Sequence, residues 1–485
     1  MTATSSNTDT STPLAECDAK TLRALYESGR ASPVEATRAA LEQIERFNGE
    51  VNAFCHVDHD GALKAARDSE SRWQQGEPLG PLDGIPASMK DLSEVAGMPV
   101  RDGSLTTGGG LCDHDGPPAQ FLREAGAVLL GKTTTPEFGW KATTDSRVTG
   151  ITRNPWNTDL TPGGSSGGAA VAAALNMGVL HQGGDSGGSI RIPAAFTGVF
   201  GFKSTFGWVP QWPPSTMASL SHIGPLTRTV DDAIAMLNVI GRFHGHDYFS
   251  VPGQPANWGE QCDEAGRLDG LKIAFCPALG TAARDDEISH CVGRAAHQME
   301  KLGAQVDRIE PEVESSLETY RILWATASAT QLADMTPQQK ELLDPGLLEI
   351  AEWGRAFSAV DLLRAQTTRT RLNRHMDHFL DSYDLILTPS VPIAAFEVGH
   401  NVPPGSGMRD WMEWTPFSYP FNLTQQPAAS VPCGFTASGL PIGLQLVGAR
   451  FDDARVLRAC RAYMTAFPPR FPERLNESRN RVSGY

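Results

Sequence analysis

The sequence lacks paired cysteines, a surplus of positive charge and any long hydrophobic run. Its eight cysteines include no C-x-x-C pair, which argues against a zinc ribbon and a disulfide framework. Lysine and arginine number 41 against 56 aspartate and glutamate, and the net charge of −15 repels phosphate backbones and anionic membranes. No stretch reaches the roughly 18 apolar residues of a membrane span. We therefore expect a cytoplasmic protein that binds neither nucleic acid nor membrane.

The remaining composition is that of an ordinary folded protein. Hydrophobic residues make up 40% and charged residues 20% of the 485 residues, so a large core is available. Residues 1–15 are polar and rich in Ser and Thr, without the basic start and apolar stretch of a signal peptide, and are expected to form a disordered tail. Residues 16–485 contain no repeat or linker-like stretch and are expected to form one domain.

Local patterns predict alternating helices and strands. Ser32-Pro33-Val34-Glu35 reads as a capping box with proline at the first helical position, and a second helix is expected over 60–75. The turn-rich segment 78–86 then delivers Lys90 to a strand or to its end. Because such alternation continues along the chain, the fold class is expected to be α/β.

Two motifs in the chain resemble known sites but lack their context. Residues 126–133 match G-x-x-x-x-G-K-[ST], yet the intervening residues read as a strand and no helix can start at the Thr-Thr-Pro that follows, so we do not expect a nucleotide site. Residues 164–168 and 184–188 both match the G-x-S-x-G motif of serine hydrolases. A mechanism in which Ser186 or Ser166 attacks through a histidine therefore stays possible. The histidine pairs are His56 with His59 and His244 with His246, in polar turn-like segments, and His375 with His378, on an expected helix rich in Arg and Asp. Solvated or capping histidines explain these pairs, and we expect no bound metal.

Three further segments occur in order along the chain. They are Gly-Ile-Pro-Ala-Ser-Met-Lys-Asp ending at Asp91, Pro-Gly-Gly-Ser-Ser-Gly-Gly over 162–168, and Gly-Gly-Ser-Ile-Arg-Ile-Pro over 187–193. Together they resemble the amidase signature family of serine hydrolases. The resemblance implies a single large domain with a mixed central sheet covered by helices on both faces, and a mainly helical insertion at about 316–380.

The same resemblance assigns roles to particular residues. It makes Ser189 the nucleophile, Ser165 a bridging serine in a cis peptide and Lys90 the general base, with no cofactor. A serine hydroxyl needs a base to take its proton, and lysine can do so only when neutral. Because its ordinary pKa is about 10.4, Lys90 must be desolvated. Activity should then rise toward alkaline pH.

The segment around the nucleophile is expected to supply supporting groups. Backbone N–H groups of Ser186, Gly187 and Gly188 would form the oxyanion hole. Ser166 would support the serine pair, and Asp185 with Arg191 is expected to be a charge pair that braces the loop. Position 181 carries a histidine where the family usually has a small residue, and we expect His181 to be packed and hydrogen-bonded.

The substrate is the least defined part of the prediction. The resemblance places Gly139 and Trp140 near the acyl site, and Trp208 is a further candidate wall. Aromatic residues near loops favour a hydrophobic or aryl amide or carbamate (urethane) as the small-molecule substrate. The alternative is the A component of the tRNA-dependent amidotransferase, which the acidic charge disfavours. A stand-alone monomer or homodimer is expected.

Overall fold

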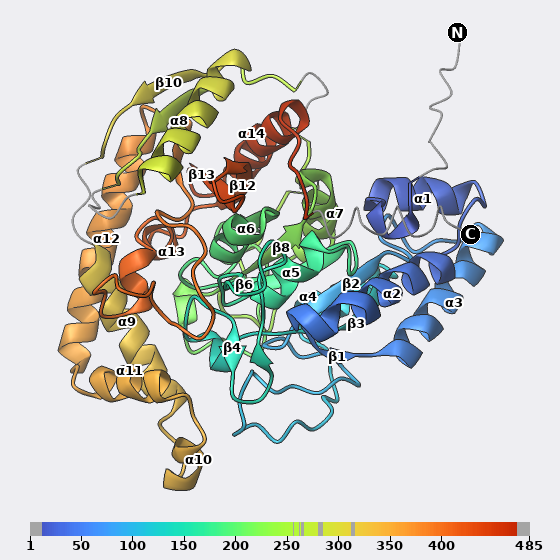
Figure 1. The fold of residues 1–485 in the computed structure, drawn as a ribbon, viewed down its shortest axis with the longest axis horizontal. Coiled ribbons are helices and arrows are strands. Elements are labelled where there is room, and N and C mark those ends of the chain that lie inside the picture. Colours follow the sequence, from blue (N-terminus) through green and yellow to red (C-terminus); the bar gives the residue numbers. More distant parts are fainter. Residues whose placement is uncertain are drawn as a thin grey trace.

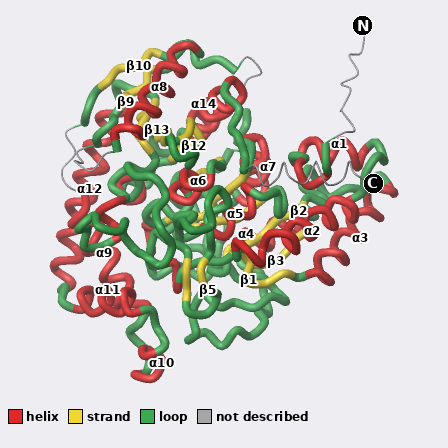
Figure 2. The backbone as a smooth tube through the Cα atoms, in the orientation of Figure 1, coloured by secondary structure: helices red, strands yellow, loops and turns green. Residues whose placement is uncertain are grey.

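Eleven strands form one mixed β-sheet at the centre of the described chain, and two short strands pair beside it (Figures 1 and 2). The computed structural model describes residues 12–255, 257–260, 262, 266–279, 285–311 and 316–472. In spatial order the strands of the sheet are β1 (Phe54–Val57), β3 (Val128–Thr133), β2 (Pro86–Lys90), β6 (Leu180–Asp185), β8 (His222–Thr227), β7 (Phe200–Lys203), β12 (Ala428–Phe435), β13 (Pro441–Gly448), β11 (Leu385–Pro389), β9 (Lys272–Phe275) and β10 (Gln305–Arg308). The separate pair is β4 (Asp145–Ser146) and β5 (Gly150–Ile151).

Helices cover both faces of this sheet, as expected. One face packs against α1 (Ala19–Glu27), α7 (Val230–Ile240), α8 (Asp286–Lys301) and α14 (Asp453–Ala466). The other packs against α2 (Pro33–Val51), α3 (His59–Gln75), α5 (Gly167–Ala174) and α6 (Arg191–Thr197). The remaining helices are α4 (Pro117–Glu124), α9 (Ser316–Gln331), α10 (Pro337–Glu341), α11 (Pro345–Arg355), α12 (Ala359–Leu380) and α13 (Pro420–Leu423), with short 3-10 turns at Leu14–Glu16, Glu137–Gly139, Ala218–Leu220 and Trp411–Trp414.

The local signals used in the sequence produce the elements that they predict. Ser32 accepts a hydrogen bond from the Glu35 N–H, and the Glu35 side chain bonds back to Ser32, so the capping box opens α2. The helix expected over 60–75 is α3, and Lys90 is the last residue of β2. Leu14–Glu16 already form a helical turn, whereas residues 1–11 of the expected tail lie outside the described residues.

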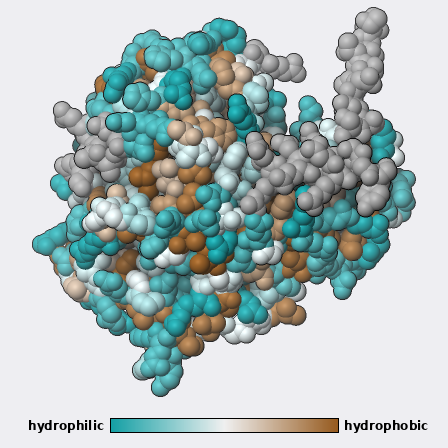
Figure 3. Space-filling model, viewed as in Figure 1, coloured by the Kyte–Doolittle hydropathy of each residue, from teal (hydrophilic) through white to brown (hydrophobic). Residues whose placement is uncertain are grey.

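Segment 316–380 contains α9 to α12, which lie together along one edge of the molecule (Figure 1). Helix α9 packs against α11, α12 and α13. None of the described helices is both long enough and apolar enough to cross a membrane. On the face drawn in Figure 3, polar residues cover most of the periphery and apolar residues gather toward the middle.

The alternation of side chains along β2 decides where its lysine points. Ala87 and Met89 pack into the core shared by α7 and α14. Because successive side chains of a strand point to opposite faces, Ser88 and Lys90 point to the face covered by α5. The strand therefore fixes the lysine on the side where the Gly/Ser-rich loop precedes α5.

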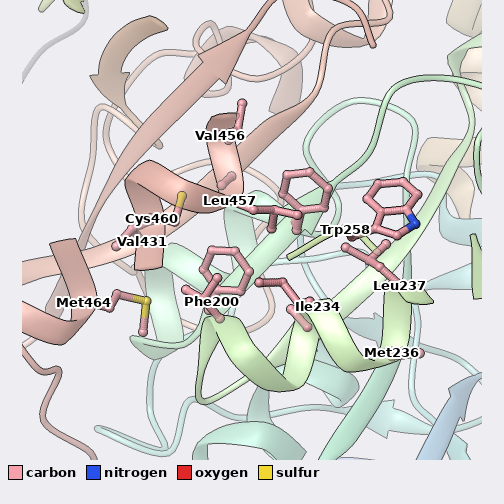
Figure 4. Packing of buried hydrophobic residues seen from close by; sticks show 14 of the residues in the cluster. Phe200, Ile234, Met236, Leu237, Trp258, Val431, Val456, Leu457, Cys460 and Met464 are labelled. Atoms are coloured by element: carbon pink, nitrogen blue, oxygen red, sulfur yellow. The ribbon is translucent and has the colours of Figure 1, made fainter. Parts of the chain in front are cut away.

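The largest core cluster lies between the sheet and helices α7 and α14 (Figure 4). Leu237 of α7 is fully buried there beside Trp258. Replacing it with alanine removes buried methyl groups and leaves a cavity that a close-packed core fills only in part.

We expect Leu237→Ala to lower the free energy of unfolding by about 2–5 kcal/mol, measured by urea denaturation. Leu363→Ala is the matched control, because Leu363 also lies on a helix but is 66% exposed. That substitution should change the free energy by no more than about 0.5 kcal/mol. Equal effects of the two variants would contradict the packing described for α7.

Candidate active site

The Lys90 amine lies in the protein interior against two serine hydroxyls. Its Nζ is 2.6 Å from Ser165 Oγ and 3.0 Å from Ser166 Oγ, and the side chain is almost completely buried. The Lys90 backbone N–H donates to Gln182 Oε1 on neighbouring β6. Sheet pairing and the Gln182 contact hold the backbone of Lys90, and the two serine hydroxyls hold its amine.

Burial changes the proton affinity of this amine. Desolvation lowers the pKa of Lys90 to about 7, although the negative charge of Asp185 acts in the opposite direction. A large fraction of the amine is therefore neutral near neutral pH. The same value falls within the range of ordinary histidines, so a pH profile by itself does not distinguish lysine from histidine as the base.

The loop before α5 presents the serine pair. The Gly164–Ser165 peptide bond is cis, as the resemblance implies. Ser166 Oγ donates to the Gly184 carbonyl at 3.1 Å, and the Ser166 N–H donates to the Ser189 carbonyl, also at 3.1 Å. These bonds tie the loop that carries Ser165 to the loop that carries Ser189.

Ser189 lies between the end of β6 and α6, with 7% of its surface exposed. Within the described chain, no hydrogen bond joins its hydroxyl to Ser165. Both side chains nevertheless border the same cavity. Hydrogen bonds of this kind are often long in a free enzyme and tighten when substrate binds.

The expected oxyanion donors require one correction. The Gly188 N–H is already used, because it donates to Asp185 Oδ1 at 2.7 Å. The Asp185 carboxylate turns back over its own loop and also accepts the Ile190 N–H at 3.2 Å. The N–H groups of Ser186 and Gly187 have no acceptor among the described residues, so these two remain available to a ligand.

Asp185 and Arg191 form the bracing pair expected at this loop. The two side chains are fully buried and share two hydrogen bonds of 2.9 Å. Burial alone would raise the pKa of Asp185, but the charge and hydrogen bonds of Arg191 hold it below the usual value. Arg191 also donates to three groups that lie far away in the sequence, which are Ser418 O, Asn422 Oδ1 and Gln445 Oε1.

Tyr320 of α9 supports the loop from the other side, and no local pattern in the sequence predicts this contact. Its hydroxyl donates to the Ser186 carbonyl at 3.3 Å, and its ring stacks on Tyr419 with 4.8 Å between centroids. A Cβ on Gly187 would lie 1.9 Å from the Tyr320 hydroxyl, so only glycine fits at this position. The Tyr320 hydroxyl thus packs directly against Gly187, whose N–H has no acceptor among the described residues.

A cavity of about 310 Å³ opens above Lys90, Ser165 and Ser189. Gly139 borders it, and a Cβ there would lie 3.3 Å from Ser165 Oγ. Apolar side chains contribute much of the wall: Leu92, Val100, Phe138, Met217, Ile223 and Trp324. Trp324 comes from α9, one helical turn after Tyr320.

The structure does not place the two predicted tryptophans at the cavity. Trp208 packs edge-on against Trp258 with 5.1 Å between centroids, inside the main core. Trp140 is buried in a second core cluster, where Gly346 approaches its ring. Neither ring borders the cavity, because segments distant in sequence bury both of them.

The histidines do not form a catalytic pair with these serines. Among the described residues, no histidine is hydrogen-bonded to Ser166, Ser186 or Ser189. His181 lies 2.8 Å from Ser88 Oγ, through Nδ1, and burial lowers its pKa to about 4. It is therefore the packed, hydrogen-bonded residue that we expected.

The part of the chain that the structure describes contains one group with the spacing of metal ligands, formed by Glu94, Cys112 and His114. Its three residues belong to the segment between β2 and α4, and Glu94 also borders the cavity. The histidine pairs considered in the sequence do not belong to it.

Comparison with known proteins identifies the family. The amidase family model matches residues 35–457. The chain belongs to the amidase signature family. Its members are hydrolases of C–N bonds, and the fold of this chain is theirs.

Individual relatives share most of their length with this chain. An acylamidase of Rhodococcus erythropolis is 33% identical, covering 92% of this chain and 94% of the relative. The A component of the glutamyl-tRNA(Gln) amidotransferase of Myxococcus xanthus is 35% identical, over 91% of this chain and 95% of the relative. The crystal structure of a bacterial aryl acylamidase superposes with a TM-score of 0.87 at 29% identity, covering 94% and 97% of the two chains.

We expect amide hydrolysis to increase with pH through about 7 and then to level off, because only the neutral Lys90 amine accepts a proton. Lys90→Met should lower kcat/KM by roughly 10²- to 10⁴-fold, since methionine occupies similar space without a basic atom. Lys64→Met, on the exposed face of α3, is the matched control. Substantial activity in Lys90→Met would rule out lysine as the base.

We expect Tyr320→Phe to lower kcat roughly 2- to 10-fold, which corresponds to the net worth of one hydrogen bond. KM and the pH profile should stay unchanged, because the hydroxyl supports the loop without entering the cavity. Tyr248→Phe is the control, as Tyr248 is 91% exposed. A rise in KM alone would instead place Tyr320 in substrate binding.

Proposed function

We propose that this chain hydrolyses amide or carbamate C–N bonds of hydrophobic or aryl small molecules through an acyl-enzyme on Ser189. The observation that carries the proposal is the buried Lys90 amine, 2.6 Å from Ser165 Oγ and on the floor of the cavity that Ser189 borders. Such a chain of groups can move a proton between a nucleophile and a base without a histidine.

In the first step, Ser189 Oγ attacks the carbonyl carbon and its proton passes through Ser165 to the neutral Lys90 amine. The oxygen of the tetrahedral intermediate accepts hydrogen bonds from the free N–H groups of Ser186 and Gly187. Such donors contribute about 3–4 kcal/mol each where they have been removed. When the C–N bond breaks, the proton returns through Ser165 to the leaving nitrogen, and the amine departs.

In the second step, water attacks the ester on Ser189 with Lys90 again taking the proton through Ser165. The acid is released and the serine is restored. A carbamate follows the same course, with the amine leaving first and a carbonate ester remaining on Ser189 until water cleaves it. No step requires a redox group.

The cavity wall supports an apolar or aryl substrate. Phe138 and Trp324 border the space above the serines, and Met217 adds a flexible apolar side chain. Rings and thioethers recognise apolar groups through contact area rather than through hydrogen bonds. The aryl acylamidase relative agrees with this choice.

The amidotransferase alternative rests on the 35% identity to the A component from Myxococcus xanthus. The cavity argues against it. Among the described residues that border the cavity, Lys90 is the only one with a basic side chain, whereas Glu94 and Asp102 are acidic. An acidic cavity in a chain of charge −15 is unfavourable for a polyanionic tRNA.

We expect a fluorophosphonate to label Ser189, as determined by peptide mapping with mass spectrometry. Ser189→Ala should lose both the label and the release of p-nitroaniline from a p-nitroanilide substrate. Ser186→Ala should keep the label, because alanine retains the backbone N–H. The rates of p-nitroaniline release from a p-nitroanilide and from an N-(p-nitrophenyl) carbamate, measured in parallel, decide between an amide and a carbamate as the preferred substrate.

A label on Ser186 or Ser166 would instead support a histidine-dependent mechanism. Label on Ser189 without turnover of either substrate would favour an amidotransferase component that needs its partners. Absence of both label and turnover would contradict the proposed function.

A further inference from the structure

One side of the cavity is acidic, and the proposed mechanism does not use it. Glu94 and Asp102 border the same space as Lys90, Ser165 and Ser189. Both acidic residues lie in the loop that follows β2. Desolvation lowers the pKa of Lys90 to about 7, so Lys90 loses its positive charge as the pH rises above neutral.

Asp102 has a fixed backbone and a free side chain. Its N–H donates to the Asp91 carbonyl at 3.2 Å, and its own carbonyl accepts the Phe138 N–H at 2.7 Å. The residue adopts a left-handed backbone conformation with φ of 52°, which aspartate tolerates better than most residues. Within the described chain its carboxylate forms no hydrogen bond or ion pair.

The surroundings of Asp102 favour a positive partner. Burial raises the pKa of Asp102 to about 7, and the negative charges of Asp91 and Glu94 act in the same direction. The charge of the nearby Lys132 lowers the pKa of Asp102 only in part, since Lys132 pairs with Asp91 at 3.7 Å and donates to the Ser93 carbonyl at 2.6 Å. A cation entering the cavity would therefore meet a carboxylate without a counter-ion.

Glu94 adds to the same wall but is partly engaged. Its Oε2 lies 2.6 Å from His114 Nε2, and its carbonyl accepts the Gly116 N–H at 3.0 Å. His114 is half exposed, whereas the Glu94 Oε2 atom itself is buried. Glu94 thus adds a second acidic side chain to the cavity wall that Asp102 borders.

We propose that Asp102, supported by Glu94, forms a subsite for a protonated amino group of the substrate or of the amine product. The substrates would be amides or carbamates that carry a second amine at the end of an apolar spacer. The spacer would lie along Leu92, Val100 and Phe138, and the ammonium would donate charge-assisted hydrogen bonds to the Asp102 carboxylate. This assignment names a substrate class for the proposed function and rests on it.

The subsite is tested by direct titration, which needs no turnover. The probes are 4-phenylbutylamine, 4-phenylbutanol and 4-phenylbutyrate, which share one apolar part and differ in charge. At pH 8 the amine is protonated, since its pKa is near the 10.4 of a lysine, and Asp102 is ionised. We expect the amine to bind at least tenfold more tightly than the alcohol by calorimetry, and the carboxylate to bind most weakly.

The variant Asp102→Asn keeps the shape of the side chain and removes its charge. It should reduce the preference for the amine over the alcohol to less than about twofold while leaving alcohol binding unchanged. Asp68→Asn is the matched control, because Asp68 is exposed on α3 and pairs with Lys64. Glu94→Gln should give a smaller loss than Asp102→Asn.

Turnover supplies a second readout. In the wild type, kcat/KM should be higher for 6-aminohexanoyl p-nitroanilide than for hexanoyl p-nitroanilide. Asp102→Asn should remove this difference mainly through KM, because the ammonium binds equally in the ground and transition states.

The outcomes separate the two proposals. Tight amine binding without hydrolysis of any amide or carbamate would overturn the proposed function and leave the subsite standing. Hydrolysis without a preference for the amine, or a preference that survives in Asp102→Asn, would overturn the subsite alone.

Discussion

The burial of one amine among hydroxyls is the constraint on which the site depends. Lys90 reaches Ser165 and Ser166 from the end of a central strand, and desolvation brings its pKa to about 7. A lysine at the surface would keep its proton at this pH and could not act as a base. The sheet, the loop before α5 and the side chain of Gln182 all serve to keep water from this amine while holding it still.

An unpaired buried charge close to the amine would undo this arrangement, and a second pair of side chains prevents it. Asp185 is near enough to raise the pKa of Lys90. Its negative charge is compensated by Arg191, whose remaining donors reach Ser418, Asn422 and Gln445. One ion pair therefore braces the loop that carries Ser189 and limits the electrostatic effect of that loop on Lys90. Removing either partner would leave an uncompensated charge in the interior.

The sequence predicts those parts of the site that are encoded locally. The capping box at Ser32, the strand that ends at Lys90 and the loop before α5 follow from neighbouring residues, and their order supports the family assignment. Trp208 and Trp140 could not be placed in this way, because the segments that bury them are far away in the chain. The same is true of Tyr320, which reaches the Ser186 carbonyl from a helix more than a hundred residues later. The Gly188 donor was misjudged because a side chain, rather than the turn itself, decides which N–H groups stay free.

Helix α9 both supports the loop that follows β6 and forms part of the cavity wall. Tyr320 supports the loop that carries Ser186 and Ser189, and Trp324, one turn further along, forms part of the cavity wall. Natural variation at the wall position can alter which molecules fit while the adjacent turn keeps the loop in place. Evolution can therefore change substrate preference at Trp324, provided that any shift of the helix axis stays small enough for Tyr320 to keep its contact. New specificities should arise more readily by exchanging side chains on α9 than by inserting or deleting residues within it.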